Sequence, residues 1–350
     1  MFSFRTTPLE EQLDRALRDG KVGCFCNASA WNPASGEYVW EIFEKRGNLA
    51  RVFRPSESEK EPYGKIDFSQ EDLEGLNAVV VDFQDSGCRH YAFTRDLMRL
   101  LLFRSRMEEG PSIYIIDRPN PMGREVEGTL PTTLEAELWT AEVTHRHGLT
   151  IGELAYYYQH ESGENFPLHV ISADTFPREL MSWAVPPATD IPGLFTLAFY
   201  TGGSLWHDTS ISPGTGTSRP YEYIGAPFIK PSSTPPCPEG VLMRPCHFTP
   251  AFGPYEGQEC GGYQILLRPG ARYHSLMHTL RLMRFFSEHY SGFEMSESLF
   301  VKIADPVIAE YLRGGITFDI VQEHIKSEEQ KWTRKARRFC LYGESPCRIK

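Results

Sequence analysis

The sequence predicts an α/β protein in which a Rossmann-like parallel sheet is followed by a smaller α+β domain. Short apolar runs alternate with helical segments through the first half of the chain, as expected for βαβ units. Some of these runs, such as 78–81, are continuously apolar and β-branched, which is typical of strands buried on both faces. From about residue 241 this alternation stops. We therefore expect residues 1–235 to form the first domain and residues 236–350 the second.

The elements of the first domain follow from local patterns. A leucine stripe over 7–17 predicts an initial helix. Strands are expected at 21–27, 49–53, 78–81, 112–116 and 167–172, and helices at 39–45, 67–76, 91–109, 150–160 and 193–200. The helix over 91–109 has the clearest apolar face, and Gly110 ends it. Glu153 follows Thr150 by three residues, which indicates a capping box and a structural role for this glutamate.

The second half of the chain begins with a long segment, 201–236, that has no regular pattern and is rich in Gly, Ser, Thr and Pro. Segments of this length are usually disordered or functional. Because it also carries many polar and aromatic side chains, we favour a functional loop. Beyond it the sequence predicts strands over 243–248 and 262–267 and helices over 273–289, 297–302, 305–313 and 317–339.

Composition excludes several classes of function. The net charge of -10 argues against a nucleic-acid partner, which favours a basic surface. There is no run of about 18 apolar residues, so no membrane span is expected. The first residues lack the apolar core of a signal peptide, so the chain as it stands is expected to be cytoplasmic, or periplasmic or secreted if a signal was removed. None of the eight cysteines forms a CxxC pair, and no metal site is expected.

Acidic residues follow three successive predicted strands: Glu57, then Asp82 with Asp85, then Asp117. In open parallel sheets the carboxyl ends of the strands lie at one edge, and ligands bind outside that edge. A single aspartate in such a place is as often a turn residue or a helix cap. Three acidic strand ends together favour a shared site.

Five motifs occur in order along the chain: DFQDSGCRHYAF (82–93), DRPNPMGREVEG (117–128), HGLTIGELA (147–155), GTGTSRPYEYIGAPF (214–228) and FTPAFGPYEGQECGGYQI (248–265). Together they resemble the motifs of the NamZ-type exo-β-N-acetylmuramidases, a family long catalogued as the domain of unknown function DUF1343, of which this chain looks like a divergent member. The resemblance implies a Rossmann-like domain, a smaller partner domain and a cleft between them. It also implies release of terminal N-acetylmuramic acid from peptidoglycan fragments, without a cofactor.

Two segments depart from the family pattern. Where the family has P-E-H-G after the second strand, this chain has Pro-Ser-Glu-Ser, so the carboxylate is either shifted to Glu57 or lost. Where the family has E-G-T-N-x-S-E-G-R-G-T, this chain has HDTSISPGTGT, with His207, Pro213 and Thr215 in place of two acids and an arginine. The alternative function is therefore a catalytically impaired or repurposed member that binds cell-wall sugar fragments.

Glycoside hydrolysis needs a carboxylic acid at the leaving oxygen and a second group at the anomeric carbon. We expect Glu57 to be the acid, although a solvated loop charge is an open alternative, with Asp82 or Asp85 facing it as the second carboxylate and Glu127 in reserve. Arg89 either pairs with Asp85 or binds the lactyl carboxylate of the sugar. The side chains expected to contact a sugar or muropeptide are Asp82, Gln84, Arg89, Tyr91, Asp117, Arg118, Asn120, His147, His207, Arg219 and Glu222.

Overall fold

The computed structural model describes residues 13, 17, 19–32, 35–54, 66–132, 143–172, 185–231 and 234–342. Most of the helix expected over 7–17 lies outside the described residues, and so does Glu57. Within the described part of the chain, no helix is both long enough and apolar enough to cross a membrane.

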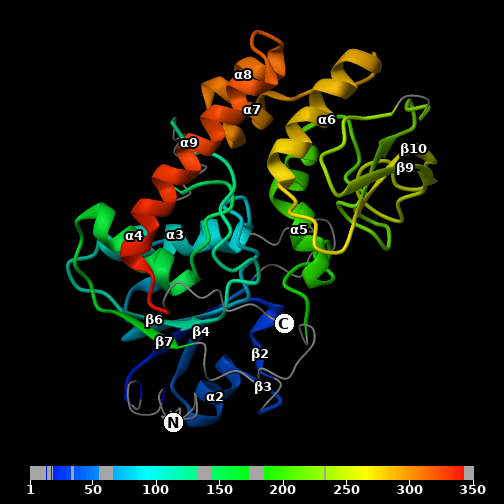
Figure 1. Cartoon of the computed structure of the whole chain (residues 1–350). Coiled ribbons are helices and arrows are strands. Elements are labelled where there is room, and N and C mark those ends of the chain that lie inside the picture. Colours follow the sequence, from blue (N-terminus) through cyan, green and yellow to red (C-terminus); the bar gives the residue numbers. More distant parts are fainter. Residues whose placement is uncertain are drawn as a thin grey trace, which may run out of the picture.

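The first part of the molecule is a five-stranded parallel sheet, which confirms the predicted α/β class (Figure 1). Its strands are β1 (Val22–Cys26), β4 (Leu49–Phe53), β5 (Ala78–Asp82), β6 (Ser112–Asp117) and β7 (Leu168–Ser172). They are arranged in the order β4-β1-β5-β6-β7. Every residue of β1 and β5 is buried, as the apolar runs predicted. β4 lies on one side of β1, and β5, β6 and β7 follow on its other side. The strand order therefore reverses between β1 and β5.

Helices connect the strands of this sheet. They are α2 (Val39–Arg46), α3 (Ala92–Ser105) and α4 (Ile151–Ser162), and a short hairpin of β2 (Trp31–Asn32) and β3 (Glu37–Tyr38) follows the 3-10 turn η1 (Ala28–Ala30). The capping box predicted at the start of α4 is present, because Thr150 N donates to Glu153 Oε2 at 2.9 Å and Glu153 N donates to Thr150 Oγ1 at 3.3 Å. Glu153 is therefore structural, as expected.

The helix predicted over 67–76 was wrong, since only the 3-10 turn η2 (Glu71–Leu73) forms there. Ser69 N donates to Asp72 Oδ2 at 2.8 Å, and such a local side-chain acceptor competes with helical hydrogen bonds. Gly75 then takes a left-handed conformation with φ of 72°, which ends the segment.

The second part combines an antiparallel sheet with helices. The sheet has the order β8-β10-β9, with β8 (Tyr223–Ala226), β9 (Val241–Phe248) and β10 (Cys260–Leu267). The helices are α5 (Leu194–Gly203), α6 (Ser275–His289), α7 (Glu297–Ile303), α8 (Pro306–Arg313) and α9 (Phe318–Ala336), with 3-10 turns η4 (Ser204–Asp208) and η5 (Arg337–Phe339). The expectation of an irregular 201–236 was thus wrong in part, because this segment contains the end of α5, η4 and β8.

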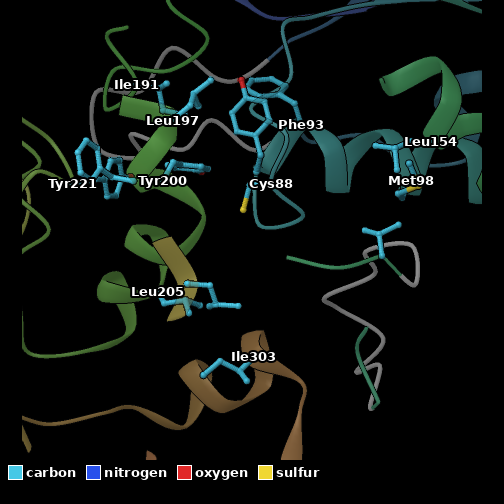
Figure 2. Close-up of a cluster of buried hydrophobic side chains, with 14 of the residues drawn as sticks. Cys88, Phe93, Met98, Leu154, Ile191, Leu197, Tyr200, Leu205, Tyr221 and Ile303 are labelled. Carbon is cyan, nitrogen blue, oxygen red and sulfur yellow. The ribbon is translucent and has the colours of Figure 1, made fainter. Parts of the chain in front are cut away.

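The two parts share elements and a core. β8 pairs with β10 and α5 packs on α6, although both β8 and α5 precede residue 235. A Cβ at Gly262 would lie 2.1 Å from Ile224 O, so only glycine permits the close pairing of β8 with β10. The main buried cluster contains Cys88 and Leu97 of the first part and Leu197 and Ile303 of the second, and Figure 2 labels several of its members.

Helix α9 brings the end of the described chain back to the parallel sheet, where it runs close to α4 (Figure 1). Trp332 is fully buried, its ring meets Tyr157 edge-on at 5.1 Å, and its Nε1 donates to His147 O at 2.8 Å. The loops at the carboxyl edge of the sheet are therefore held between the two parts of the molecule.

Candidate functional site

The carboxyl ends of β1 and β5 are joined by polar side chains. Ser29 Oγ, just beyond β1, accepts a hydrogen bond from Gln84 N, just beyond β5, at 2.8 Å. Asn27 Nδ2 donates to the hydroxyl of Tyr91 at 3.2 Å, and that hydroxyl donates to Pro187 O at 3.0 Å. Since the strand order reverses between β1 and β5, this is where an open α/β sheet binds ligands.

Asp82 and Arg118 form a two-point ion pair at this edge, with Nε–Oδ1 of 2.6 Å and Nη2–Oδ2 of 3.2 Å. Burial raises the pKa of Asp82, and the charge of Arg118 partly offsets that effect. The Arg118 side chain is 10% exposed, whereas Arg89 is 1% exposed. Arg118 is thus the more accessible guanidinium of these two candidates.

Gln84 spans the adjacent loops, because its Nε2 donates to Asp85 O at 3.0 Å and to Pro119 O at 3.1 Å. Asn120 makes similar connections: its Nδ2 donates to Leu149 O at 2.8 Å and its Oδ1 accepts from Met122 N at 2.9 Å. Gln84 thus joins the loops that follow β5 and β6, and Asn120 joins the beginning of the β6–α4 connection to its end.

Asp85 is buried and fully engaged. Its carboxylate accepts from Gly87 N at 3.0 Å and from Thr94 Oγ1 at 2.8 Å, and it lies 3.2 Å from His147 Nε2. His147 Nδ1 accepts from Leu149 N at 3.2 Å, which leaves the imidazole proton on Nε2, facing Asp85. These contacts fix the loop after β5 against the loop before α4.

Arg89 donates to backbone carbonyls rather than to Asp85. Its guanidinium meets Thr129 O at 2.8 Å, Lys302 O at 2.9 Å and Ile303 O at 2.7 Å. The last two carbonyls end α7, where the helix presents unpaired oxygens. Arg89 therefore joins the two parts of the molecule.

Glu127, like Arg89, connects the first part of the molecule to the second. Its Oε2 accepts from Ser275 Oγ at 2.8 Å and from Leu276 N at 3.0 Å, at the start of α6. Its Oε1 lies 2.6 Å from Arg146 Nη1. Burial disfavours the charged form, but Arg146, His274 and these hydrogen bonds together hold the pKa of Glu127 below its ordinary value.

Asp117 anchors α4. It accepts from Thr150 Oγ1 at 2.7 Å, from Gly152 N at 2.9 Å and from Tyr342 OH at 2.8 Å. Burial raises the pKa of Asp117 to about 6 despite these donors. The predicted acidic strand end is thus present, in the position of a helix anchor.

A second polar network lies around η4. His207 Nε2 is 3.1 Å from the hydroxyl of Tyr221, which donates to the buried carboxylate of Asp190. Burial lowers the pKa of His207 to about 4, so its imidazole is neutral at pH 7. Tyr221 has a φ of 64°, which is unfavourable for a bulky residue and is typical of functional or tightly constrained positions.

Arg219 and Glu222, the remaining predicted residues, contact each other. Arg219 is half exposed, and its Nη1 lies 3.4 Å from Glu222 Oε1, so the two side chains form a salt bridge. Among the described residues, no group of three His, Cys, Asp or Glu side chains is placed to hold a metal ion. The sequence reasoning missed Asn27, Ser29 and Asp190. Asn27 directly follows β1, so the rule that flagged Asp82 would have found it.

Comparison with known proteins shows which family this chain is similar to. Residues 62–191 match the family model for "Exo-beta-N-acetylmuramidase NamZ, N-terminal", and residues 198–342 match the corresponding C-terminal model. The chain is 26% identical over 299 residues to the peptidoglycan beta-N-acetylmuramidase NamZ of Bacillus subtilis (strain 168), covering 80% of this chain and 71% of that protein.

Two crystal structures of DUF1343 family proteins from Bacteroides fragilis NCTC 9343 share the fold. One superimposes with a TM-score of 0.75 at 19% identity, covering 95% of this chain and 97% of the other. The second gives a TM-score of 0.74 at 18% identity, covering 96% and 98%. The arrangement of a parallel sheet with a smaller antiparallel part is thus an experimentally observed one.

Proposed function

We propose that this chain, which belongs to the NamZ family, is a glycoside hydrolase. It would release a terminal, N-acetylmuramic-acid-like amino sugar from peptidoglycan fragments. The observation that carries this proposal is that two sets of polar contacts, those of Asn27, Ser29 and Gln84 and the Asp82–Arg118 pair, lie at the adjacent carboxyl ends of β1 and β5, where Cys26 pairs with Asp82. Hydroxyl and amide groups beside a guanidinium suit a polar sugar that bears a carboxylate.

The division of roles within this site follows from burial. Asp85 and Glu127 are each engaged by several donors inside the protein, so we assign them to positioning rather than to proton transfer. Glu57 keeps the role of general acid as a prediction from the sequence alone. We assign recognition of the lactyl carboxylate to Arg118 rather than to Arg89, since Arg118 retains exposure and Arg89 is directed at carbonyl oxygens.

The test is the product formed from a defined muropeptide. The protein is incubated with a tetrasaccharide fragment whose non-reducing end is N-acetylmuramic acid, and the products are separated by chromatography. We expect free N-acetylmuramic acid and a shortened fragment in equal amounts. Cleavage at internal bonds only, or no cleavage of any muropeptide, would contradict the proposal.

A second candidate is a member that binds such fragments without cleaving them. It is favoured by His207, which stands where the family has an acid and is neutral beside Tyr221. Calorimetry separates the two candidates, because this one requires binding of the intact fragment with no product after prolonged incubation.

A further inference from the structure

A hollow of about 470 Å³ lies between α9 and the segment that follows β6. Four of its described lining side chains are cationic, namely Arg124, Lys326, Arg334 and Arg337, and Glu329 is the acidic one. We propose that this hollow, called here the α9 groove, binds an anionic ligand that presents several carboxylate or phosphate oxygens. Its volume lies within the range of small-molecule sites.

Glu329 does not neutralise the groove, because its carboxylate is engaged elsewhere. Its Oε1 accepts from Gly128 N at 2.8 Å and lies 2.7 Å from His274 Nε2, and neither Gly128 nor His274 lines the groove. His274 in turn has its pKa raised, against the effect of burial, by Glu127 and Glu329. The acidic side chain therefore takes part in a separate cluster at the start of α6.

Arg124 supplies a fixed guanidinium opposite α9, but its charge is already paired with Glu153, so Lys326 and Arg334 are the main source of positive charge in the groove. Its Nη2 donates to Glu153 Oε1 at 2.7 Å, its Nη1 donates to Gly148 O at 3.1 Å, and it pairs with the second oxygen of Glu153 as well. A guanidinium held on a carboxylate in this way loses little further freedom when it meets a ligand.

The helix supplies the other cations. Among the described residues, no carboxylate lies within ion-pair distance of Lys326 or Arg334. Like charges repel when they share one helix face, and the protein as a whole carries a net charge of -10, so this cluster is not a consequence of basic composition. The helix dipole favours cations in the last turn of α9, which accounts for Arg334 but not for Lys326 or Arg124.

The ligand class rests on the proposed function. The peptide stem of a muropeptide carries several carboxylates, and Gln330 and Thr333 add neutral hydrogen-bonding groups to the same wall of the groove. Arg124 lies just beyond the carboxyl end of β6, two strands from β1, at the same edge of the sheet as the proposed sugar site. Free inorganic phosphates share the oxyanion chemistry and are the competing source of ligand.

The test compares two variants with the same loss of charge. Lys326→Gln with Arg334→Gln removes two groove cations, and the control Lys331→Gln with Arg338→Gln removes two cations of the same helical region that do not line the groove. Calorimetry uses two probes on the full chain, a peptidoglycan stem tripeptide and inorganic pyrophosphate, at low and at high salt. Thermal melting establishes that both variants are folded.

We expect at least one probe to bind the wild type and the control variant with equal affinity. The same probe should bind the groove variant about tenfold or more weakly, because charge-assisted hydrogen bonds are lost. Binding should weaken with salt. Tripeptide binding without pyrophosphate binding identifies the stem as the source, and the reverse identifies phosphate. Absence of binding by both probes, or equal binding by both variants, overturns the proposal. The binding measurement does not require hydrolysis, so a failure of this proposal can be distinguished from a failure of the proposed hydrolase activity.

Discussion

Glu127 and Arg146 form an ion pair of 2.6 Å in which both side chains are buried, and Glu127 also accepts hydrogen bonds from the first turn of α6. Arg146 belongs to the loop before α4, and α6 belongs to the second part of the molecule. The pair therefore connects the carboxyl edge of the sheet to the helices that pack against it. Its burial leads to a direct test of the structural role assigned to Glu127.

Glu127→Ala should lower the free energy of unfolding by about 3 kcal/mol, because it leaves the charge of Arg146 buried without its closest partner. Urea denaturation measures this change. Glu125→Ala is the matched control: Glu125 also faces Arg146, at 3.2 Å, but is 61% exposed, so its removal should cost less than about 1 kcal/mol. Equal losses in the two variants would contradict the assignment.

Asp117 should make the protein less stable as the pH rises from about 4 to about 6. Its pKa is about 6 when folded against an ordinary value of 3.8, so the folded state binds the proton more tightly and loses that advantage as the group ionises. The contribution is on the order of 3 kcal/mol. Asp117→Asn should remove this slope in denaturation curves taken across that range, and a slope unchanged by the substitution would refute the assignment.

His207 should make the protein less stable as the pH falls, which is the opposite of the effect of Asp117. Its pKa falls from 6.5 to about 4 on folding, so the folded state binds the proton less tightly and stability is lost as the pH falls from about 6.5 towards 4. His207→Gln should therefore be less sensitive to acid than the wild type over this range. Thermal melting of both proteins at several pH values measures the difference, and parallel pH profiles would show that His207 is not buried in this way.

Arg89 and Arg118 should respond differently to substitution by lysine. Arg89→Lys loses carbonyl contacts that a compact ammonium cannot reproduce, so we expect lower stability, with KM little changed in the protein that remains folded. Arg118→Lys should instead raise KM by about tenfold, as expected when a bidentate partner of a carboxylate is lost. Melting temperatures and steady-state kinetics on a muramide provide both readouts. A KM effect confined to Arg89→Lys would reverse the assignment.

Much of the parallel sheet could be predicted because its signals are local. The apolar run in β5 and the stripe in α3 need only neighbouring residues to be recognised, and the capping box at Thr150 is a four-residue pattern. β8 was missed because its four residues, Tyr223–Ala226, are short and include glycine. Its strand character comes from pairing with β10, which lies about 40 residues later.

The candidate site was predictable only as a region. The rule that polar residues follow buried strands found Asp82 and Asp117, but it does not distinguish a ligand contact from a helix anchor. That distinction depends on partners remote in sequence: Arg89 meets carbonyls at residues 302 and 303, and Glu127 meets residues 275 and 276. Such contacts leave no trace in the local pattern.

The central claim is that this chain hydrolyses a terminal β-linked amino sugar with Glu57 as the acid. It is tested most directly by release of N-acetylmuramic acid from its β-linked disaccharide with N-acetylglucosamine, because a sugar leaving group requires protonation. We predict turnover by the wild type and by the neighbouring control Glu59→Gln, with kcat/KM lowered about a hundredfold or more in Glu57→Gln, as for loss of a general acid. Turnover that is undiminished in Glu57→Gln, or no release by the wild-type protein, would contradict the claim.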